Sequence, residues 1–407
     1  MRRRDWLQRA PLTLLLTLVA LTGCMRRLDV TAHPTTVKIV SSLPRTGSAN
    51  QQTTPIVNAV RMAMEEAGGR AGPWTVLYED WDDASAKKGD WDPEVEAGNA
   101  TRAITDPDVM AYIGPYNSGA AKISMPLLNA ARLPMIAIAT YPGLTKPGAG
   151  EANEPNVYRP AGIINFVRIN PADDIQGRQA AAWIRAMGGT NVYVLDDQGL
   201  YGRGLADVFY DAADDVGLTV LGRDAIDPKA QEYRSLMTRI KNLNPEWIYF
   251  GGTTQTNAGQ VIKDVVATGL GAKVMVPDAS FDQALIQAAG GANAEQRVFA
   301  TFGGMPADKL TGRGAAFVTR YRAKYGVLPE AYAVYGYVAT QVILDALARV
   351  PVKDRDAVRR AILATQQVDG VLGSWSFAPT GDSTLQILSG NVVRDGTFQF
   401  ATTLGAP

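Results

Sequence analysis

Short runs of β-branched and aromatic residues alternate along the chain with longer stretches of helical periodicity. Ten runs have the length and composition of strands: Val37–Leu43, Trp74–Tyr78, Val109–Gly114, Met135–Ala139, Phe166–Ile169, Asn191–Leu195, Thr219–Arg223, Trp247–Phe250, Lys273–Val276 and Val298–Phe302. Amphipathic stretches between them predict helices: Ile56–Ala67, Ala120–Ala131, Gln176–Met187, Gly204–Val216, Gln231–Leu243 and Gly259–Thr268. Such alternation is typical of α/β proteins with parallel sheets covered by helices on both faces. Because ten strands are too many for one open sheet here, we expect two doubly wound parallel-sheet lobes.

The pattern changes after residue 302, where three helical stretches follow one another. They span Gly314–Tyr325, Tyr332–Ala348 and Lys353–Thr365. The last residues again have strand character, at Gly373–Phe377, Leu385–Val393 and Thr397–Phe400. The dipeptide Asp395-Gly396 between the final two runs predicts a tight hairpin turn.

The first residues have the layout of a secretory signal. Four arginines precede an apolar run, Ala10–Leu21, which is too short to cross a membrane comfortably. The sequence Leu-Thr-Gly that follows ends at Cys24 and resembles a bacterial lipobox. We therefore expect a signal peptide over residues 1–23, lipidation of Cys24 and a polar tether over residues 24–36. The alternative is an ordinary signal peptide or an N-terminal anchor helix with a chance cysteine.

Composition excludes several classes of function. The 40 basic and 40 acidic residues balance, and loss of residues 1–23 makes the net charge −3, so a nucleic-acid binder is not expected. Cys24 is the only cysteine, which excludes an internal disulfide, and the only histidine, His33, falls in the tether. No Gly-x-Ser-x-Gly motif surrounds Ser118. We expect neither an enzyme nor a bound metal or cofactor.

One acidic segment, residues 80–94, is the exception considered for a metal. Its carboxylates could hold calcium, but their spacing fits no EF-hand. We interpret the segment as a solvated loop.

Polar and glycine-rich sequences follow the predicted strands, and ligands of open parallel sheets bind beyond these strand ends. The sequences include residues 41–47, 114–119, 139–143, 196–202, 251–256 and 277–280. Hydroxyl side chains dominate the first half of the chain, whereas carboxylates and tyrosine join them in the second half. A cleft between two lobes would place hydroxyls and helix N-termini on one wall and anionic groups on the other.

Several sequences at these places resemble the type I periplasmic binding proteins of ABC transporters, in particular the Leu/Ile/Val-binding branch. The resemblance covers nearly all of residues 37–402 and rests on the order and spacing of many short matches. They include Asn58-Ala59-Val60-Arg61, Tyr112-Ile113-Gly114-Pro115 with Ser118, Ala139-Thr140, Arg168 followed by Gln176-Gly177, Asp197 followed by Tyr201-Gly202-Arg203-Gly204, Phe250-Gly251-Gly252, and Pro277-Asp278.

The resemblance implies two α/β lobes joined by three crossings, near Gly162–Phe166, near Phe302–Gly304 and in the last 25 residues. Lobe 1 would comprise residues 37–163 and 303–385. Lobe 2 would comprise residues 164–302 and 386–407.

The resemblance also implies a ligand site. Ser118 and Thr140 match the hydroxyls that bind an amino acid's α-carboxylate, Ala139 would offer backbone groups, and Asp278 matches the acidic residue that pairs with the α-ammonium group. Tyr201 matches an aromatic residue lying over the ligand. Ordinary structural roles remain open: a helix N-cap for Ser118, a turn residue for Asp278 and loop packing for Tyr201.

Two expected pocket residues depart from the family pattern. Thr253 and Gln52 stand where aromatic residues are common, which predicts a more polar side-chain pocket and weakens a branched-chain assignment.

The expected function is that of an extracytoplasmic, lipid-anchored substrate-binding protein. It would capture an amino acid, branched-chain or related, by hinge closure and deliver it to an ABC permease. The alternative is a receptor of the same fold that senses an amino acid or amide and signals to a membrane or regulatory partner.

Overall fold

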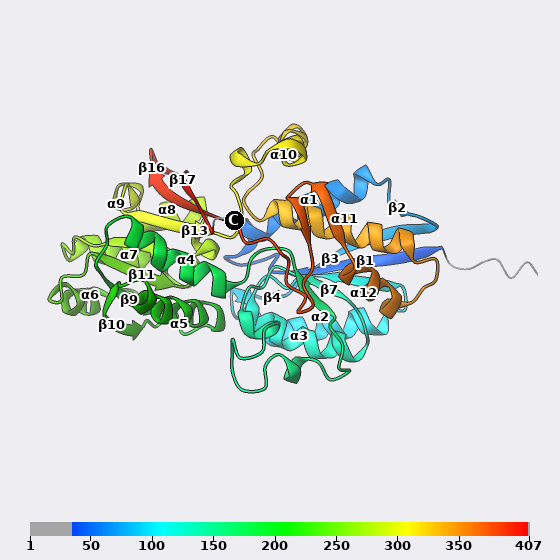
Figure 1. The fold of residues 1–407 in the computed structure, drawn as a ribbon, viewed down its shortest axis with the longest axis horizontal. Helices are drawn as coiled ribbons and strands as arrows, with labels where there is room; N and C mark the ends of the chain where they lie inside the picture. The colour runs from blue at the N-terminus through cyan, green and yellow to red at the C-terminus, as the bar shows by residue number, and fades with distance from the viewer. Residues whose placement is uncertain (1–34, 406–407) are drawn as a thin grey trace, which may run out of the picture. The chain divides into compact units, whose positions relative to one another are not determined.

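The computed structural model describes residues 35–405. The expected signal peptide, the lipidation site Cys24 and most of the tether, with His33, lie outside the described residues. Within them the chain forms two main sheets, each covered by helices (Figure 1). This arrangement confirms the predicted two-lobed α/β fold.

The first sheet has six strands in the order β2-β3-β1-β6-β7-β8. All neighbours are parallel except β2 and β3, which form an antiparallel edge. The strands span Thr36–Leu43 (β1), Arg70–Ala71 (β2), Trp74–Asp82 (β3), Val109–Ile113 (β6), Met135–Ala137 (β7) and Phe166–Arg168 (β8). β6, β7 and β8 are buried at every position, which is the pattern of a sheet covered on both faces.

The second sheet has seven strands in the order β10-β9-β11-β12-β13-β16-β17. Its strands pair in parallel except for β16, which is antiparallel to both of its neighbours, β13 and β17. They span Asn191–Asp196 (β9), Thr219–Ala225 (β10), Trp247–Gly251 (β11), Lys273–Val276 (β12), Val298–Phe302 (β13), Leu388–Arg394 (β16) and Thr397–Leu404 (β17). Asp395 and Gly396 both have positive φ, as the predicted hairpin turn requires. Two small hairpins stand apart, formed by Ala84–Ser85 (β4) with Asp90–Trp91 (β5) and Gln366–Gly370 (β14) with Gly373–Ser376 (β15).

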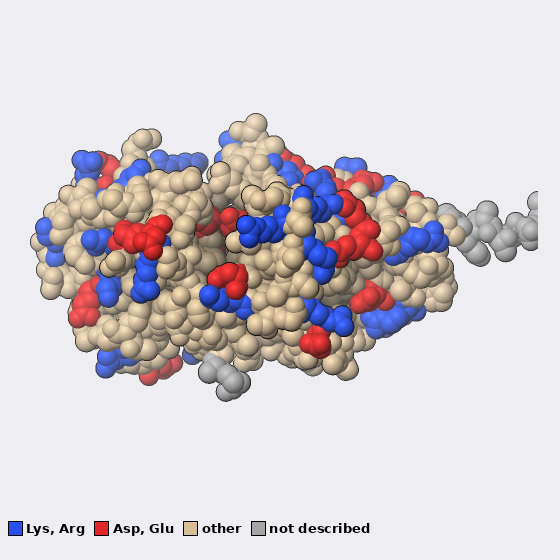
Figure 2. All heavy atoms as spheres, turned by 90° about the horizontal axis from the view of Figure 1, so that it is seen from above, with Lys and Arg blue, Asp and Glu red and all other residues tan. Residues whose placement is uncertain are grey.

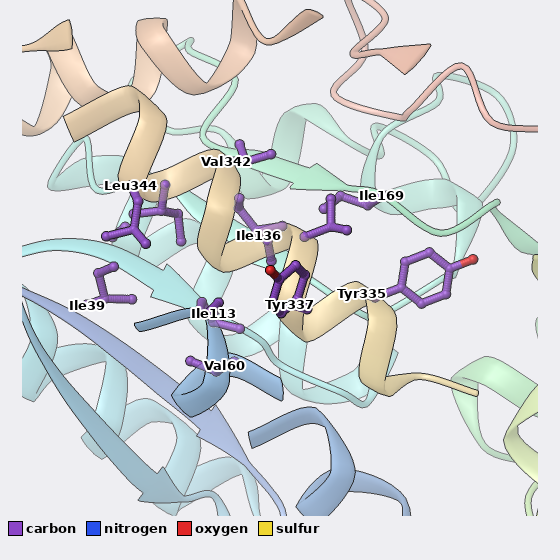
Figure 3. Packing of buried hydrophobic residues seen from close by; sticks show 14 of the residues in the cluster. Ile39, Val60, Ile113, Ile136, Ile169, Tyr335, Tyr337, Val342 and Leu344 are labelled. Atoms are coloured by element: carbon purple, nitrogen blue, oxygen red, sulfur yellow. The ribbon is translucent and has the colours of Figure 1, made fainter. Parts of the chain in front are cut away.

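Helices from distant parts of the sequence cover the first sheet. They are α1 (Asn50–Glu66), α2 (Pro93–Thr105), α3 (Ser118–Ala130), α11 (Ala333–Arg349) and α12 (Arg355–Leu363), while α10 (Gly312–Tyr325) packs on α1 and α11. α1 and α11 pack together, and their apolar side chains meet those of β1, β6 and β7 in the core (Figure 3). α2 and α3 pack together and contribute to a second cluster of buried residues.

The second sheet is covered by α4 (Asp173–Ala186), α5 (Leu200–Asp215), α6 (Arg234–Lys241), α7 (Ala258–Ala267), α8 (Gln283–Ala289) and α9 (Gly291–Ala294). Two clusters of buried residues again separate these helices from the sheet. Each lobe is therefore a three-layer sandwich whose strands end at the edge where polar loops begin.

The first crossing lies later in the chain than expected. We expected lobe 2 to begin at residue 164, but β8 pairs with β7 and so belongs to the first sheet. The chain leaves this sheet after Arg168, whose guanidinium is buried among carbonyl groups of the first lobe. Asp382 pairs with Arg168 through an isolated backbone β-bridge. After Asp382 the chain continues to β16 of the second sheet.

The acidic segment of residues 80–94 is not the solvated loop that we expected. It contains the end of β3 and the hairpin β4–β5, and it packs Asp83 and Asp92 into the interior. Asp92 caps α2 by accepting from the backbone N–H of Glu94, at 3.0 Å. The segment is therefore an ordered part of the first lobe.

Both signs of charge are interspersed on the face shown in Figure 2. Across residues 35–405, no group of three or more His, Cys, Asp or Glu side chains has an arrangement suited to a metal ion. No helix in this range combines the length and the apolar character needed to cross a membrane.

Candidate functional site

Loops from both lobes meet around a small cavity of about 30 Å³. Most of the lining follows the carboxyl ends of β6, β7, β9, β11 and β12, where ligands of parallel α/β folds bind. The lining residues are Tyr116, Asn117, Ser118, Ile138, Thr140, Tyr201, Thr253, Ala279 and Tyr332.

Ser118 occupies the first turn of α3 and is 2% exposed. The N-cap position belongs to Asn117, so Ser118 is not the plain helix cap that we considered. Its Oγ accepts a hydrogen bond from the backbone N–H of Tyr141, at 3.3 Å. The free N–H groups of this 13-residue helix lie beside the hydroxyl, and together they favour an anionic group.

A buried ion pair fixes the loop that carries Thr140. The Arg168 guanidinium donates to the carbonyls of Ala139 (3.2 Å) and Tyr141 (2.9 Å), on either side of Thr140. It also forms an ion pair with Asp382, at 2.6 Å. Burial alone would raise the pKa of Asp382, but the positive charges of Arg168 and Lys146 lower it below its ordinary value. Thr140 is thus held against the cavity by its neighbours' backbone.

Asp278 follows β12 and lies close to the cavity, almost completely buried. Its Oδ1 accepts from the hydroxyl of Tyr201 (2.5 Å) and from the backbone N–H of Ala279 (3.1 Å). Burial raises the pKa of this carboxyl, while hydrogen bonds from Tyr201 and Tyr332 oppose the rise. The structure therefore brings Asp278 and Tyr201 together, as a shared site requires.

Asp173 is a second buried carboxylate, which the sequence analysis missed. It is the first residue of α4, fully buried, and its backbone N–H donates to the carbonyl of Thr140, at 3.1 Å. Within residues 35–405, neither carboxylate oxygen has a hydrogen-bond partner. Burial and then the negative charge of Asp278 raise the pKa of Asp173 well above its ordinary value. Two buried carboxyl groups whose charges repel each other favour a cationic group beside them.

Two tyrosines of the first lobe, Tyr116 and Tyr332, were also missed. Their rings pack edge to face with centroids 5.5 Å apart and form part of the cavity wall. The sequence placed Tyr116 in the polar segment after a predicted strand and Tyr332 at the start of a predicted helix, and nothing in it singled out either residue. Their meeting depends on tertiary structure.

The other three expected site residues have different surroundings. Thr253 lines the cavity, and its hydroxyl contacts that of Thr256, at 3.2 Å. Ala139 is buried behind the cavity, and its carbonyl accepts from Arg168. Gln52 lies outside the lining, and its amide forms hydrogen bonds with protein groups.

The arrangement matches the two ends of a zwitterion. Hydroxyls and a helix N-terminus from the first lobe would bind an anionic group, whereas Asp278 and Asp173 would bind a cationic one. Aromatic rings between them would cover apolar parts of the ligand.

Comparison with known proteins identifies the family. Residues 36–387 match a family model described as "Periplasmic binding protein". Leu/Ile/Val-binding protein BraC3 of Rhizobium johnstonii is 26% identical over 359 residues, covering 85% of this chain and 88% of its own length. Its name describes a protein that binds leucine, isoleucine and valine, which supports a substrate-binding role for the family.

Solved structures share the fold. A leucine-binding protein, LivK, from Thermotoga maritima has a TM-score of 0.79 and 23% identity, covering 91% of this chain and 99% of its own. A solute-binding protein of an ABC transporter from R. palustris, solved with benzoate, has a TM-score of 0.75 and 19% identity, covering 91% and 97%. The family consists of solute-binding proteins rather than enzymes and implies an extracytoplasmic location. The chain therefore belongs to the type I periplasmic binding proteins, in the branched-chain amino acid family.

Proposed function

We propose that this protein is a lipid-anchored substrate-binding protein that captures an α-amino acid and delivers it to an ABC permease. The observation that carries the proposal is the pairing of two opposite recognition groups around one cavity. Ser118, in the first turn of α3, lines it from the first lobe, and Tyr201, whose hydroxyl donates to Asp278, lines it from the second.

The charges support an amino acid over a simple anion. An α-carboxylate would accept from Ser118, Thr140 and backbone N–H groups, while the α-ammonium would neutralise Asp278 and Asp173. Without a cation, these carboxyls would have to stay protonated or carry an unpaired buried charge. An ammonium group removes that cost, and so contributes to affinity.

An aromatic carboxylate is the second candidate. One structural neighbour was solved with benzoate, which has no ammonium group. Here the Tyr201 hydroxyl already donates to Asp278, an arrangement that satisfies a carboxyl group without any ligand cation. The two candidates predict different dependence on Asp278.

Calorimetry on the full chain with Cys24→Ser, titrated with a panel of amino acids and with benzoate, distinguishes them. We expect at least one amino acid to bind, and Ser118→Ala and Asp278→Asn each to weaken it about 10- to 100-fold, because each removes a charge-assisted contact. Asp214→Asn, on the exposed side of α5, is the matched control and should leave affinity unchanged.

Binding of benzoate alone, with affinity unaffected by Asp278→Asn, would replace the amino-acid proposal with the aromatic one. The anchor is tested separately by cell fractionation. We expect the wild-type chain in the membrane fraction and the Cys24→Ser variant to be released, and an unchanged distribution would show that anchoring does not require Cys24.

A further inference from the structure

Gln52 joins the two lobes directly. It projects from α1 of the first lobe, and its Nε2 donates to the carbonyl of Ala279 (2.9 Å) and to Asp282 (2.5 Å) in the second lobe. Its Oε1 accepts from the hydroxyl of Tyr116, at 2.8 Å. The side chain is 4% exposed, so every group of this amide is used inside the protein.

Hydrogen bonds within the second lobe orient Asp282 independently of Gln52. Its Oδ1 accepts from the backbone N–H of Leu285 (2.7 Å), which caps α8, and from the hydroxyl of Thr254 (3.1 Å). The other oxygen, Oδ2, accepts from Gln52. Tyr116 orients Gln52 in the same way from the first lobe, so both partners are fixed in position for this contact.

A third contact reinforces the connection. Gln255 of the second lobe donates to the Oε1 of Gln52 (3.3 Å) and to the carbonyl of Ser48 (3.4 Å) in the first lobe. The bond to Asp282 has an ionisable acceptor in a largely buried place, which makes it stronger than a solvent-exposed amide bond. All these bonds link residues more than 200 positions apart, and they break when the lobes separate.

We propose that Gln52 and Asp282 form a latch between the lobes, which sets the balance between open and closed forms. Gln52 acts by holding the lobes together beside the cavity, rather than by contacting the ligand. The latch goes beyond the proposed function because it would favour closure on any ligand. Where closure stabilises binding, the population of the closed form sets the apparent affinity.

Electron paramagnetic resonance distances test the latch without any ligand. Cys24 is the only cysteine, so the full chain with Cys24→Ser has no other thiol that a spin label could modify. The two labels are attached at Thr101→Cys and Asp211→Cys, which replace exposed residues of α2 and α5. We expect Gln52→Ala to raise the ratio of open to closed forms about tenfold. Gln52→Glu should raise it further, because two carboxylates would then face each other.

The rescue variant separates a latch from a general loss of structure. In Gln52→Glu/Asp282→Asn, the new amide at position 282 can donate to the new carboxylate at position 52. An asparagine there can still cap α8, so closure should return toward wild type. Gln287→Ala, an exposed glutamine of α8, is the matched control and should leave the distances unchanged.

Two results would overturn the latch. One is the same distance distribution in wild type, Gln52→Ala and Gln52→Glu. The other is opening by Gln287→Ala as large as that by Gln52→Ala. Failure of every amino acid to bind in calorimetry would leave these distances unaffected, so the latch and the proposed ligand fail independently.

Discussion

Arg168 is the residue on which the geometry of the first wall depends. It is one of the largest fully buried side chains, and its donors reach two carbonyls and the Asp382 carboxylate. A buried charge of this kind is stable only while its partners are present. The same side chain therefore supports the fold and positions Thr140.

We predict that Arg168→Met lowers the free energy of unfolding by about 3–5 kcal/mol, because Asp382 is left as an uncompensated buried charge. Urea unfolding followed by circular dichroism measures the change. The control is Arg178→Met, at an exposed arginine of α4, which should stay within about 0.5 kcal/mol of wild type. Equal losses in the two variants would contradict the role of Arg168.

At this scale the sequence predicted residues that the fold brings together, while their role in binding stays a prediction. Ser118, Thr140, Tyr201 and Thr253 were expected in the ligand site, and they line one cavity. Asp173 was missed because nothing local distinguishes an acidic residue in a first helical turn from an ordinary helix-dipole partner. Asp173 is a candidate site residue because its side chain is completely buried, and this burial can be seen only in the folded structure.

Among the elements, the hairpin β4–β5 supports the helix that carries Ser118. Gly119, next to Ser118, leaves room for the ring of Trp91 from β5. A Cβ at position 119 would lie 2.5 Å from that ring. The acidic segment is thus packed directly behind the N-terminal end of α3.

We predict that Gly119→Ala lowers the free energy of unfolding by about 1–3 kcal/mol, because the new methyl group overpacks this contact. It should also weaken ligand binding, because α3 must shift. Adding Trp91→Phe removes the ring atoms that clash and should restore part of both losses, as a double-mutant cycle would measure. Additive losses would mean that the two residues do not constrain each other.

Strands and long helices were predicted well because their apolar periodicity is strong. The second helix, α2, was missed because its buried residues are Glu96, Ala100 and Ala103, which give no large apolar stripe. Its start is instead set by Asp92 and Pro93, a cap followed by a first-turn proline. Asp92 and Pro93 lie in the acidic segment of residues 80–94, which we interpreted as a loop, so this helix start was not recognised.

At the scale of the whole molecule, buried acids couple stability to pH. Burial raises the pKa of Glu96 to about 7, and it raises those of Asp83, Asp173 and Asp278 above their ordinary values. The folded chain therefore keeps protons that the unfolded chain releases near its ordinary carboxyl pKa values. The free energy of unfolding should fall as the pH rises through the folded-state values.

We predict that the wild type is less stable at pH 8 than at pH 5 in urea unfolding. Glu96→Gln should reduce this difference by about 1–3 kcal/mol, because position 96 then no longer loses a proton. Glu94→Gln, an exposed glutamate of the same helix, should leave the difference unchanged. A wild type that gains stability from pH 5 to 8 would contradict the assignment.

The interleaved path of the chain has a consequence for synthesis. The core of the first lobe needs α11 against α1, and the second sheet ends with β16 and β17, so segments near the C-terminus contribute to both lobes. A growing chain on the ribosome cannot finish either lobe until nearly all of its residues have emerged. Folding is therefore completed only after translation is nearly finished. During this interval the chain is still unfolded, which is the state in which a chain can pass through a protein-conducting membrane channel.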